Sequence, residues 1–117
     1  MILDYQKVAH IFIVCGKTDL RKGIDGLAAI VQHEYNLDVY DDALFLFCGG
    51  RRDRFKMLYY EKDGFLLLYK RLDQGQLRWP RSKKEIRCLT HQQIRWLLEG
   101  LSIDQPKAIS VGKRGIF

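Results

Sequence analysis

The feature that most constrains the fold is an Asp-Gly pair, Asp63-Gly64, between two runs of residues that favour β-strands. The first run covers residues 54–61 and the second covers residues 65–72. An Asp-Gly pair in such a place is a strong signal for a tight hairpin, because both residues tolerate the backbone angles of the turn. A third run, residues 43–48, is joined to the first by a glycine-rich turn. The pattern therefore predicts an antiparallel meander.

The segment before the meander predicts a strand and a helix. Residues 8–15 are apolar and β-branched, which is typical of a strand. A helix is predicted from Thr18 or Asp19 to Asn36, because either residue can cap it and apolar residues recur at helical spacing. Four of these apolar residues are expected to face the sheet: Leu20, Ile24, Leu27 and Val31. Gly23 and Gly26 fall inside this predicted helix and are expected to let it lie close to a strand or a partner.

The last third of the chain predicts one more helix. Residues 77–79 suggest a short strand stopped by Pro80, and residues 81–87 are polar and predict a loop. Thr90 and Gln93 have the spacing of a capping box, and apolar residues at helical spacing follow.

The predicted fold class is α+β. One domain, residues 1–103, holds a mainly antiparallel sheet of four or five strands packed against one or two helices. Residues 104–117 are predicted to be an extended or flexible tail. The hydrophobic fraction of 47% is enough for a packed core, which excludes a disordered chain.

Positive charge is concentrated in the middle of the chain. The formal net charge is +6, and residues 51–87 hold 12 of the 20 lysines and arginines but only 5 acidic residues. Such a basic block favours polyanionic partners, with nucleic acid first and an acidic protein or membrane second. The alternative is that these charges form a solvated face, and the sequence favours neither interpretation.

The candidate nucleic-acid-binding residues combine this block with one aromatic side chain that could stack on a base. They are Arg51, Arg52, Arg54, Lys70, Arg71, Arg78, Trp79, Arg81, Lys83, Lys84 and Arg87. Tyr59, Tyr60 and Tyr69 also interleave with these cations and could stack on bases. Taken singly they are assigned to the core, since Phe65, Leu67 and Tyr69 alternate onto one side of a strand.

Motifs for catalysis or metal binding are weak. Gly16-Lys17-Thr18 lacks the earlier glycine of a phosphate-binding P-loop, so helix capping is the preferred interpretation. Gly23-Ile24-Asp25-Gly26 resembles the loop of a KH domain only in its glycine spacing. The three histidines are scattered, so no cofactor or metal is expected. A small hydrolase or nuclease using Asp19 or Asp25 ranks last among the hypotheses.

Cysteine usage and hydropathy predict a cytoplasmic protein without a membrane partner. Cys15, Cys48 and Cys88 are widely spaced, which suits buried thiols better than disulfides. The longest apolar run, residues 43–48, is far too short to cross a membrane, and the N-terminus lacks the pattern of a signal peptide.

Several motifs in order resemble a known family. They are Thr18-Asp19-Leu20-Arg21-Lys22-Gly23-Ile24-Asp25-Gly26-Leu27, the turn Arg51-Arg52-Asp53-Arg54, then Asp63-Gly64-Phe65, Tyr69-Lys70-Arg71-Leu72, Arg78-Trp79-Pro80 and Leu98-Glu99-Gly100. Together they resemble the TnpB accessory proteins of bacterial insertion-sequence-66 elements, over roughly residues 8–103. This family is distinct from the larger RNA-guided nuclease of the same name. The first motif has no assigned role.

The resemblance implies a non-enzymatic accessory protein for DNA transposition. Its expected partners are DNA at the transposon ends and the transposase of the same element, which carries out strand transfer. The leading hypothesis is DNA-phosphate contact through residues 51–54 and 78–87. The alternative is a protein-interaction module whose basic surface docks on the transposase without strong DNA binding of its own.

Overall fold

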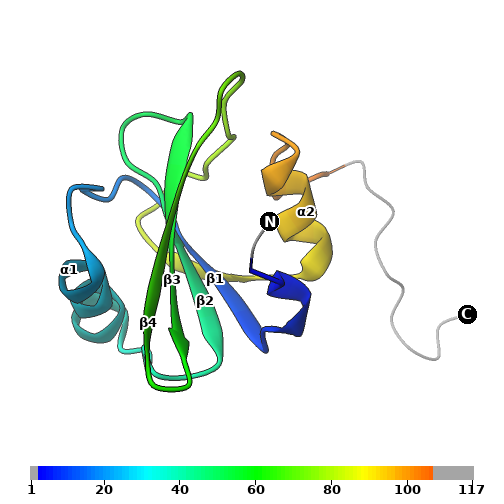
Figure 1. The fold of residues 1–117 in the computed structure, drawn as a ribbon. Helices are drawn as coiled ribbons and strands as arrows, with labels where there is room; N and C mark the ends of the chain where they lie inside the picture. Colours follow the sequence, from blue (N-terminus) through cyan, green and yellow to red (C-terminus); the bar gives the residue numbers. More distant parts are fainter. Residues whose placement is uncertain (1–2, 107–117) are drawn as a thin grey trace, which may run out of the picture.

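Five strands form one sheet in the computed structural model, which describes residues 3–106 (Figure 1). The order of the strands across the sheet is β4-β3-β2-β1-β5. Their bounds are β1 (His10–Val14), β2 (Ala43–Phe47), β3 (Arg54–Glu61), β4 (Gly64–Arg71) and β5 (Ile86–Leu89). The helical elements are a 3-10 turn η1 (Tyr5–Lys7), α1 (Ile24–Ala29) continued by a π-helical turn η2 (Ile30–Glu34), and α2 (His91–Leu98). The predicted α+β class is confirmed.

The predicted meander is present as β2, β3 and β4, joined by antiparallel pairing. In the β3–β4 hairpin Glu61 pairs with Gly64, so the turn residues are Lys62 and Asp63. Lys62 carries the positive φ of 53°, and Gly64 is already the first residue of β4. The hairpin is therefore predicted correctly, and of the three expected turn residues, Lys62, Asp63 and Gly64, the last belongs to the strand.

Two other strand predictions are wrong. Residues 86–89 form β5, which pairs antiparallel with β1. Residues 86 and 87 of this strand were assigned to a loop. Residues 77–79 form no strand, because they are held in place by buried side chains rather than by a ladder of backbone hydrogen bonds. Leu77 and Trp79 are buried, and the Trp79 indole donates a hydrogen bond to the Val14 carbonyl at 3.0 Å.

The first helix is also shorter than predicted. Gly23 is the residue that precedes α1, so Thr18 and Asp19 do not cap it. The Asp19 carboxylate instead accepts a hydrogen bond from the Arg21 backbone N–H at 3.0 Å, and this local turn competes with helix. The close packing expected from Gly23 and Gly26 is absent: a Cβ on Gly23 would meet nothing, and one on Gly26 would meet only the Lys22 side chain.

Helices cover both faces of the sheet, as Figure 1 shows with α1 on one side and α2 on the other. Leu27 and Val31 are fully buried against the first face, and Leu20 and Ile24 pack beside them as predicted. The second face packs on Ile94 and Leu97 of α2, which begins with the predicted capping box. The strands are thus fixed between two apolar layers, and the connecting loops lie at the ends of the sheet.

The remaining sequence predictions concern cysteines, membrane spans and the tail. Cys15 and Cys48 are buried as expected, whereas Cys88 lies on the edge strand β5 and is exposed. Within residues 3–106, neither helix has the length and apolar character that a bilayer requires. Most of the predicted tail, residues 107–117, lies outside the described residues.

Candidate nucleic-acid interface

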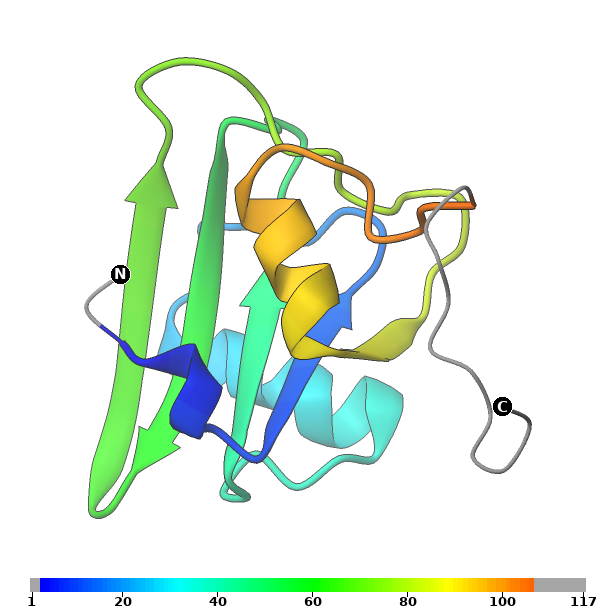
Figure 2. The same cartoon turned by 90° about the vertical axis from the view of Figure 1, so that its right-hand side faces the viewer.

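Charge is divided between the two ends of the sheet. The basic end consists of residues 15–22, 48–54 and 69–85, with 12 basic and 4 acidic residues. The acidic end consists of residues 37–42 and 61–64, with 5 acidic residues and one lysine. Figure 2 shows the long connections of the basic end at the top and the β3–β4 turn at the bottom.

Backbone hydrogen bonds join the three segments of the basic end. The Thr18 N–H donates to the Cys48 carbonyl at 2.8 Å, and the Gly16 N–H donates to the Pro80 carbonyl at 2.8 Å. A third bond of 2.7 Å runs from the Leu77 N–H to the Arg52 carbonyl. Segments far apart in the sequence therefore form one connected surface, which is what a shared binding site requires.

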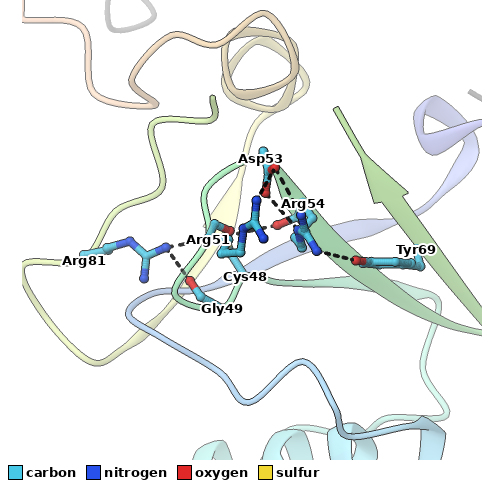
Figure 3. A network of polar contacts seen from close by, with 7 residues as sticks. All are labelled: Cys48, Gly49, Arg51, Asp53, Arg54, Tyr69 and Arg81. Carbon is cyan, nitrogen blue, oxygen red and sulfur yellow. Dashed lines mark hydrogen bonds and ion pairs between the residues drawn. The ribbon is translucent and has the colours of Figure 1, made fainter. Parts of the chain in front are cut away.

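The turn after β2 is organised by Asp53 (Figure 3). Its carboxylate accepts hydrogen bonds from Arg54 at 2.8 and 3.2 Å and lies 3.5 Å from the Arg51 guanidinium. The hydrogen bonds from Arg54 lower the pKa of Asp53. One carboxylate thus lies between two of the predicted binding arginines. Arg54 is largely occupied by it, whereas the Arg51 side chain remains 73% exposed.

Arg81 points into the protein rather than toward solvent. Its Nη2 donates to the Gly49 carbonyl and lies 3.6 Å from the Cys48 Sγ, as Figure 3 shows. Its Nε and Nη1 atoms are buried without a hydrogen-bond partner among the described residues. Arg81 therefore supports the turn at Gly49, and its expected role as a phosphate contact is corrected.

Two further predicted contacts are committed to the fold. Trp79 is 4% exposed and packs against Phe55 in the core, so its ring is not available to stack on a base. Arg87 donates two hydrogen bonds of 2.9 Å to the Asp104 carboxylate, and these lower the pKa of Asp104. Arg87 thereby ties β5 to the segment after α2, which also places Asp104 in an ordered contact.

Four of the predicted cations remain exposed and form no ion pair with a residue of the described chain: Arg52, Lys70, Arg71 and Arg78. Lys83 and Lys84 are also exposed, and their nearest carboxylates, at 3.8 and 3.9 Å, are those of Glu85 and Glu34. Ion pairs of this kind at a surface contribute little.

Arg71 has an unfavourable neighbour. It lies directly opposite Arg54 on the adjacent strand. Like charges in this position destabilise a sheet, and only Arg54 has a carboxylate to compensate it. A polyanion bound at the basic end would relieve this repulsion.

The motif of residues 18–26 forms the wall of the basic end nearest α1. Asp19 accepts hydrogen bonds from the Arg21 guanidinium at 3.0 and 2.9 Å, and these lower the pKa of Asp19 to about 2. The Lys22 carbonyl accepts a hydrogen bond from the Lys56 ammonium at 3.0 Å. Asp25 lies exposed in the first turn of α1. The motif therefore builds a rigid turn with one outward arginine, whose side chain is 92% exposed.

Gly49 explains why this wall contacts the turn after β2. A Cβ on Gly49 would lie 3.2 Å from the Leu20 side chain and 3.2 Å from the Thr18 carbonyl. The two segments therefore approach each other so closely that a Cβ at this position would crowd its neighbours. This is the close approach that was expected at Gly23 and Gly26, and it occurs at a different glycine.

One exposed residue of the basic end, Tyr69, was weighed as a stacking residue from the sequence but left out of the candidate site. Tyr69 was assigned to the core with Phe65 and Leu67, because the three alternate onto one side of a strand. Tyr69 is instead 54% exposed. It lies near the end of the edge strand β4, beyond the part of the sheet that α1 covers, and the cations around it were the only signal in the sequence.

Several open concavities lie on this surface, and two of them border exposed residues of the predicted interface. One of about 630 Å³ lies between residues 76–82 and 102–104 and includes Arg52 and Arg78. The other, of about 360 Å³, lies between residues 18–21 and 49–51 and is bordered by Tyr69. No group of three or more metal-binding side chains occurs among residues 3–106.

Comparison with known proteins identifies the family. Residues 9–108 match the family described as IS66 Orf2 like protein. Two curated proteins of Sinorhizobium fredii (strain NBRC 101917 / NGR234) are similar to this chain. Uncharacterized protein y4hO is 32% identical over 84% of this chain and 85% of its own length. Uncharacterized protein y4jC is 29% identical over 79% of each chain. No solved structure matches. The chain belongs to the IS66 Orf2-like family, the family of insertion-sequence accessory proteins that its sequence motifs resemble.

Proposed function

We propose that this chain is a non-catalytic accessory protein for transposition of an insertion sequence and that its basic end contacts DNA phosphates. Membership in the IS66 Orf2-like family points to the accessory role in transposition. The finer statement, direct contact with DNA at the transposon ends in the cytoplasm, is inferred from the charges of the basic end.

The observation that supports DNA contact is the set of exposed arginines and lysines without carboxylate partners. Arg52 lies in the segment 48–54, whereas Arg71 and Arg78 lie in the segment 69–85, and the bond from the Leu77 N–H to the Arg52 carbonyl joins these two segments. Each such cation that neutralises a phosphate releases counterions, which is the main source of sequence-independent affinity for DNA. Arg51 and Lys70 extend the same surface.

The contacts are expected to be mainly to phosphates. Both helices of the described chain lie flat on the sheet, and the basic end is formed by loops and strand ends (Figure 1). Base readout commonly uses a helix or ribbon inserted in the major groove, whereas phosphate contacts position a protein without reading sequence. Sequence specificity should therefore be modest.

The proposal assigns strand transfer to the transposase. That chemistry uses carboxylates that bind two metal ions. At the basic end, Asp19 and Asp53 are each bound by arginine guanidinium groups, which compete with a metal for the same oxygens. Their role is thus better described as holding arginines in place.

The test is fluorescence anisotropy with a labelled duplex that carries the terminal inverted repeat of the element, compared with a shuffled duplex, across a salt series. Four or five phosphate contacts predict that log K falls against log salt with a slope of about −4. A shuffled duplex should bind almost as well. Absence of binding to both duplexes at low salt would contradict the proposal.

The second candidate is a docking module for the transposase, and the acidic end supplies an observation in its favour. There Tyr40, 57% exposed, packs on Tyr60 and Phe65 with ring centroids 5.1 and 5.4 Å away. Exposed aromatic clusters are common at protein interfaces. Co-purification with the transposase that survives nuclease treatment would favour this function, and loss of the complex on nuclease treatment would count against it.

A further inference from the structure

Tyr69 is the exposed aromatic side chain of the basic end. Among the described residues, four large hydrophobic side chains are notably exposed: Tyr40, Leu66, Tyr69 and Leu101. Of these, only Tyr69 lies within the basic end, where a nucleic acid is expected to bind. An aromatic ring on a cationic surface is the arrangement with which proteins bind unpaired bases, because every base has a face that can stack.

Two anchored cations hold the Tyr69 ring in place. The Lys56 Nζ lies over the ring, 5.7 Å from its centroid, and is itself bound to the Lys22 carbonyl at 3.0 Å. Arg54 donates a hydrogen bond of 3.5 Å to the Tyr69 hydroxyl while its other nitrogens bind Asp53 (Figure 3). A ring that is fixed before binding loses little conformational entropy when a ligand stacks on it.

The concavity of about 360 Å³ beside Tyr69 has room for a ligand. It lies within the size range of about 300–1,000 Å³ that is typical of small-molecule sites. Its lining includes the apolar side chain of Leu20, the backbone of Gly50, Arg51, and Arg21 with its partner Asp19. Arginines beside an apolar side chain suit a flat base with phosphates on either side.

We propose that Tyr69 and the concavity beside it form a stacking site for an unpaired base, so that the basic end prefers DNA with a single-stranded segment. This inference rests on the proposed function and specifies its substrate. In a duplex both faces of an internal base are covered by its neighbours, so the site can be filled only where bases are unstacked. The site also gives a use to the motif of residues 18–21, which forms one of its walls.

The test compares three labelled DNAs of one sequence: a duplex, a single strand, and a duplex with a forked end. Wild-type protein should bind the single strand and the fork more tightly than the duplex. Tyr69→Ala should lower affinity for both by roughly tenfold, the loss expected for one stacked base, and change duplex affinity less than twofold. Tyr69→Phe should behave as wild type.

The matched control is Tyr40→Ala, which removes an equally exposed tyrosine from the acidic end and should change no DNA affinity. A 2-aminopurine in the unpaired segment should be quenched by the wild-type protein and not by Tyr69→Ala. Equal losses for duplex and single strand, or no loss at all, would overturn the stacking site while leaving phosphate binding intact. Failure of the wild-type protein to bind any of the three DNAs would overturn the proposed function as well.

Discussion

The basic and acidic ends of the sheet are built on the same strands but differ in the connections they carry. The basic end holds three connections, residues 15–23, 48–53 and 72–85, whereas the acidic end holds residues 36–42 and the two-residue turn of the β3–β4 hairpin. Long loops on a rigid scaffold are where binding residues usually lie. The difference shows that this fold places its longest connection and its positive charge at one end, whereas the other end carries a tight hairpin turn and carboxylates.

The opposite charges of the two ends also orient the molecule. A surface with clustered positive charge attracts a polyanion, and carboxylates at the far end repel it. The acidic end satisfies part of its charge internally: the Tyr59 hydroxyl donates to the Asp42 carboxylate at 2.8 Å, which raises the pKa of Tyr59. Under the proposed function, this asymmetry brings the basic end to DNA first and leaves the acidic end free for another partner.

The largest difference between the basic and acidic ends is expected in the free energy of unfolding that is lost when one aromatic residue is removed from each end. Trp79→Ala should lower the free energy of unfolding by about 3–5 kcal/mol, because it empties a buried site and removes the bond to Val14. Tyr40→Ala should cost only about 1 kcal/mol, since it loses aromatic contacts at the surface. Urea denaturation measures both. Equal costs would show that Trp79 is not an anchor of the basic end.

The next contrast concerns charge. Reversing Arg52, Arg71 and Arg78 to glutamate should weaken duplex binding on the order of 100-fold and reduce the steepness of the salt slope by about 3, because three phosphate contacts are lost. Reversing Asp41, Glu61 and Asp63 to lysine is the matched control and should leave affinity unchanged or higher. Anisotropy titrations measure both variants. Similar effects of the two sets would mean that only net charge matters.

A third contrast uses glycines. Gly49→Ala at the basic end should cost about 1–3 kcal/mol, because its Cβ would meet Leu20 and the Thr18 carbonyl at 3.2 Å. Gly64→Ala at the acidic end meets no atom within 4 Å and has no positive φ. It should be neutral or stabilise by about 0.5 kcal/mol, because alanine restricts the unfolded chain. Thermal unfolding of both variants is the measurement, and a neutral Gly49→Ala would show that the two segments can separate.

The parts of the fold that local pattern determines were predictable. The meander has long strands and a strong turn signal, and α2 has a capping box. The periodicity of apolar residues and local hydrogen bonds are therefore enough to predict these elements. The strand β5 was missed because Ile-Arg-Cys-Leu is short and not apolar throughout, and its pairing with β1 is a tertiary contact. The start of α1 was missed because the Asp19 side chain bonds to the Arg21 backbone instead of capping a helix.

The candidate site could be predicted only as a charged region. Composition located the positive charge, but the availability of each arginine depends on carboxylates elsewhere in the sequence, such as Asp104 for Arg87. Whether an aromatic ring is available to a ligand depends in the same way on its burial in the folded chain. Trp79 was expected at the surface and is in the core, whereas Tyr69 was expected in the core and is exposed. The burial of both residues is opposite to the expectation because it depends on which strand lies at the edge of the sheet and how much of the sheet each helix covers.

The smallest predicted effect is a change in the pKa of Asp19 at the basic end when Arg21 is replaced. The hydrogen bonds from Arg21 lower the folded-state pKa of Asp19 to about 2, from the 3.8 that is ordinary for an aspartate side chain. A carboxyl whose pKa is lowered by folding contributes stability at pH values above 3.8, and this contribution is lost as the pH falls toward 2.

In Arg21→Gln the Asp19 carboxyl should titrate closer to 3.8, as followed by the ¹³C chemical shift of its carboxyl carbon. If Asp19 titrates at the same pH in both proteins, Arg21 is free in solution, and the wall of the basic end is held by the Thr18–Cys48 backbone bond instead.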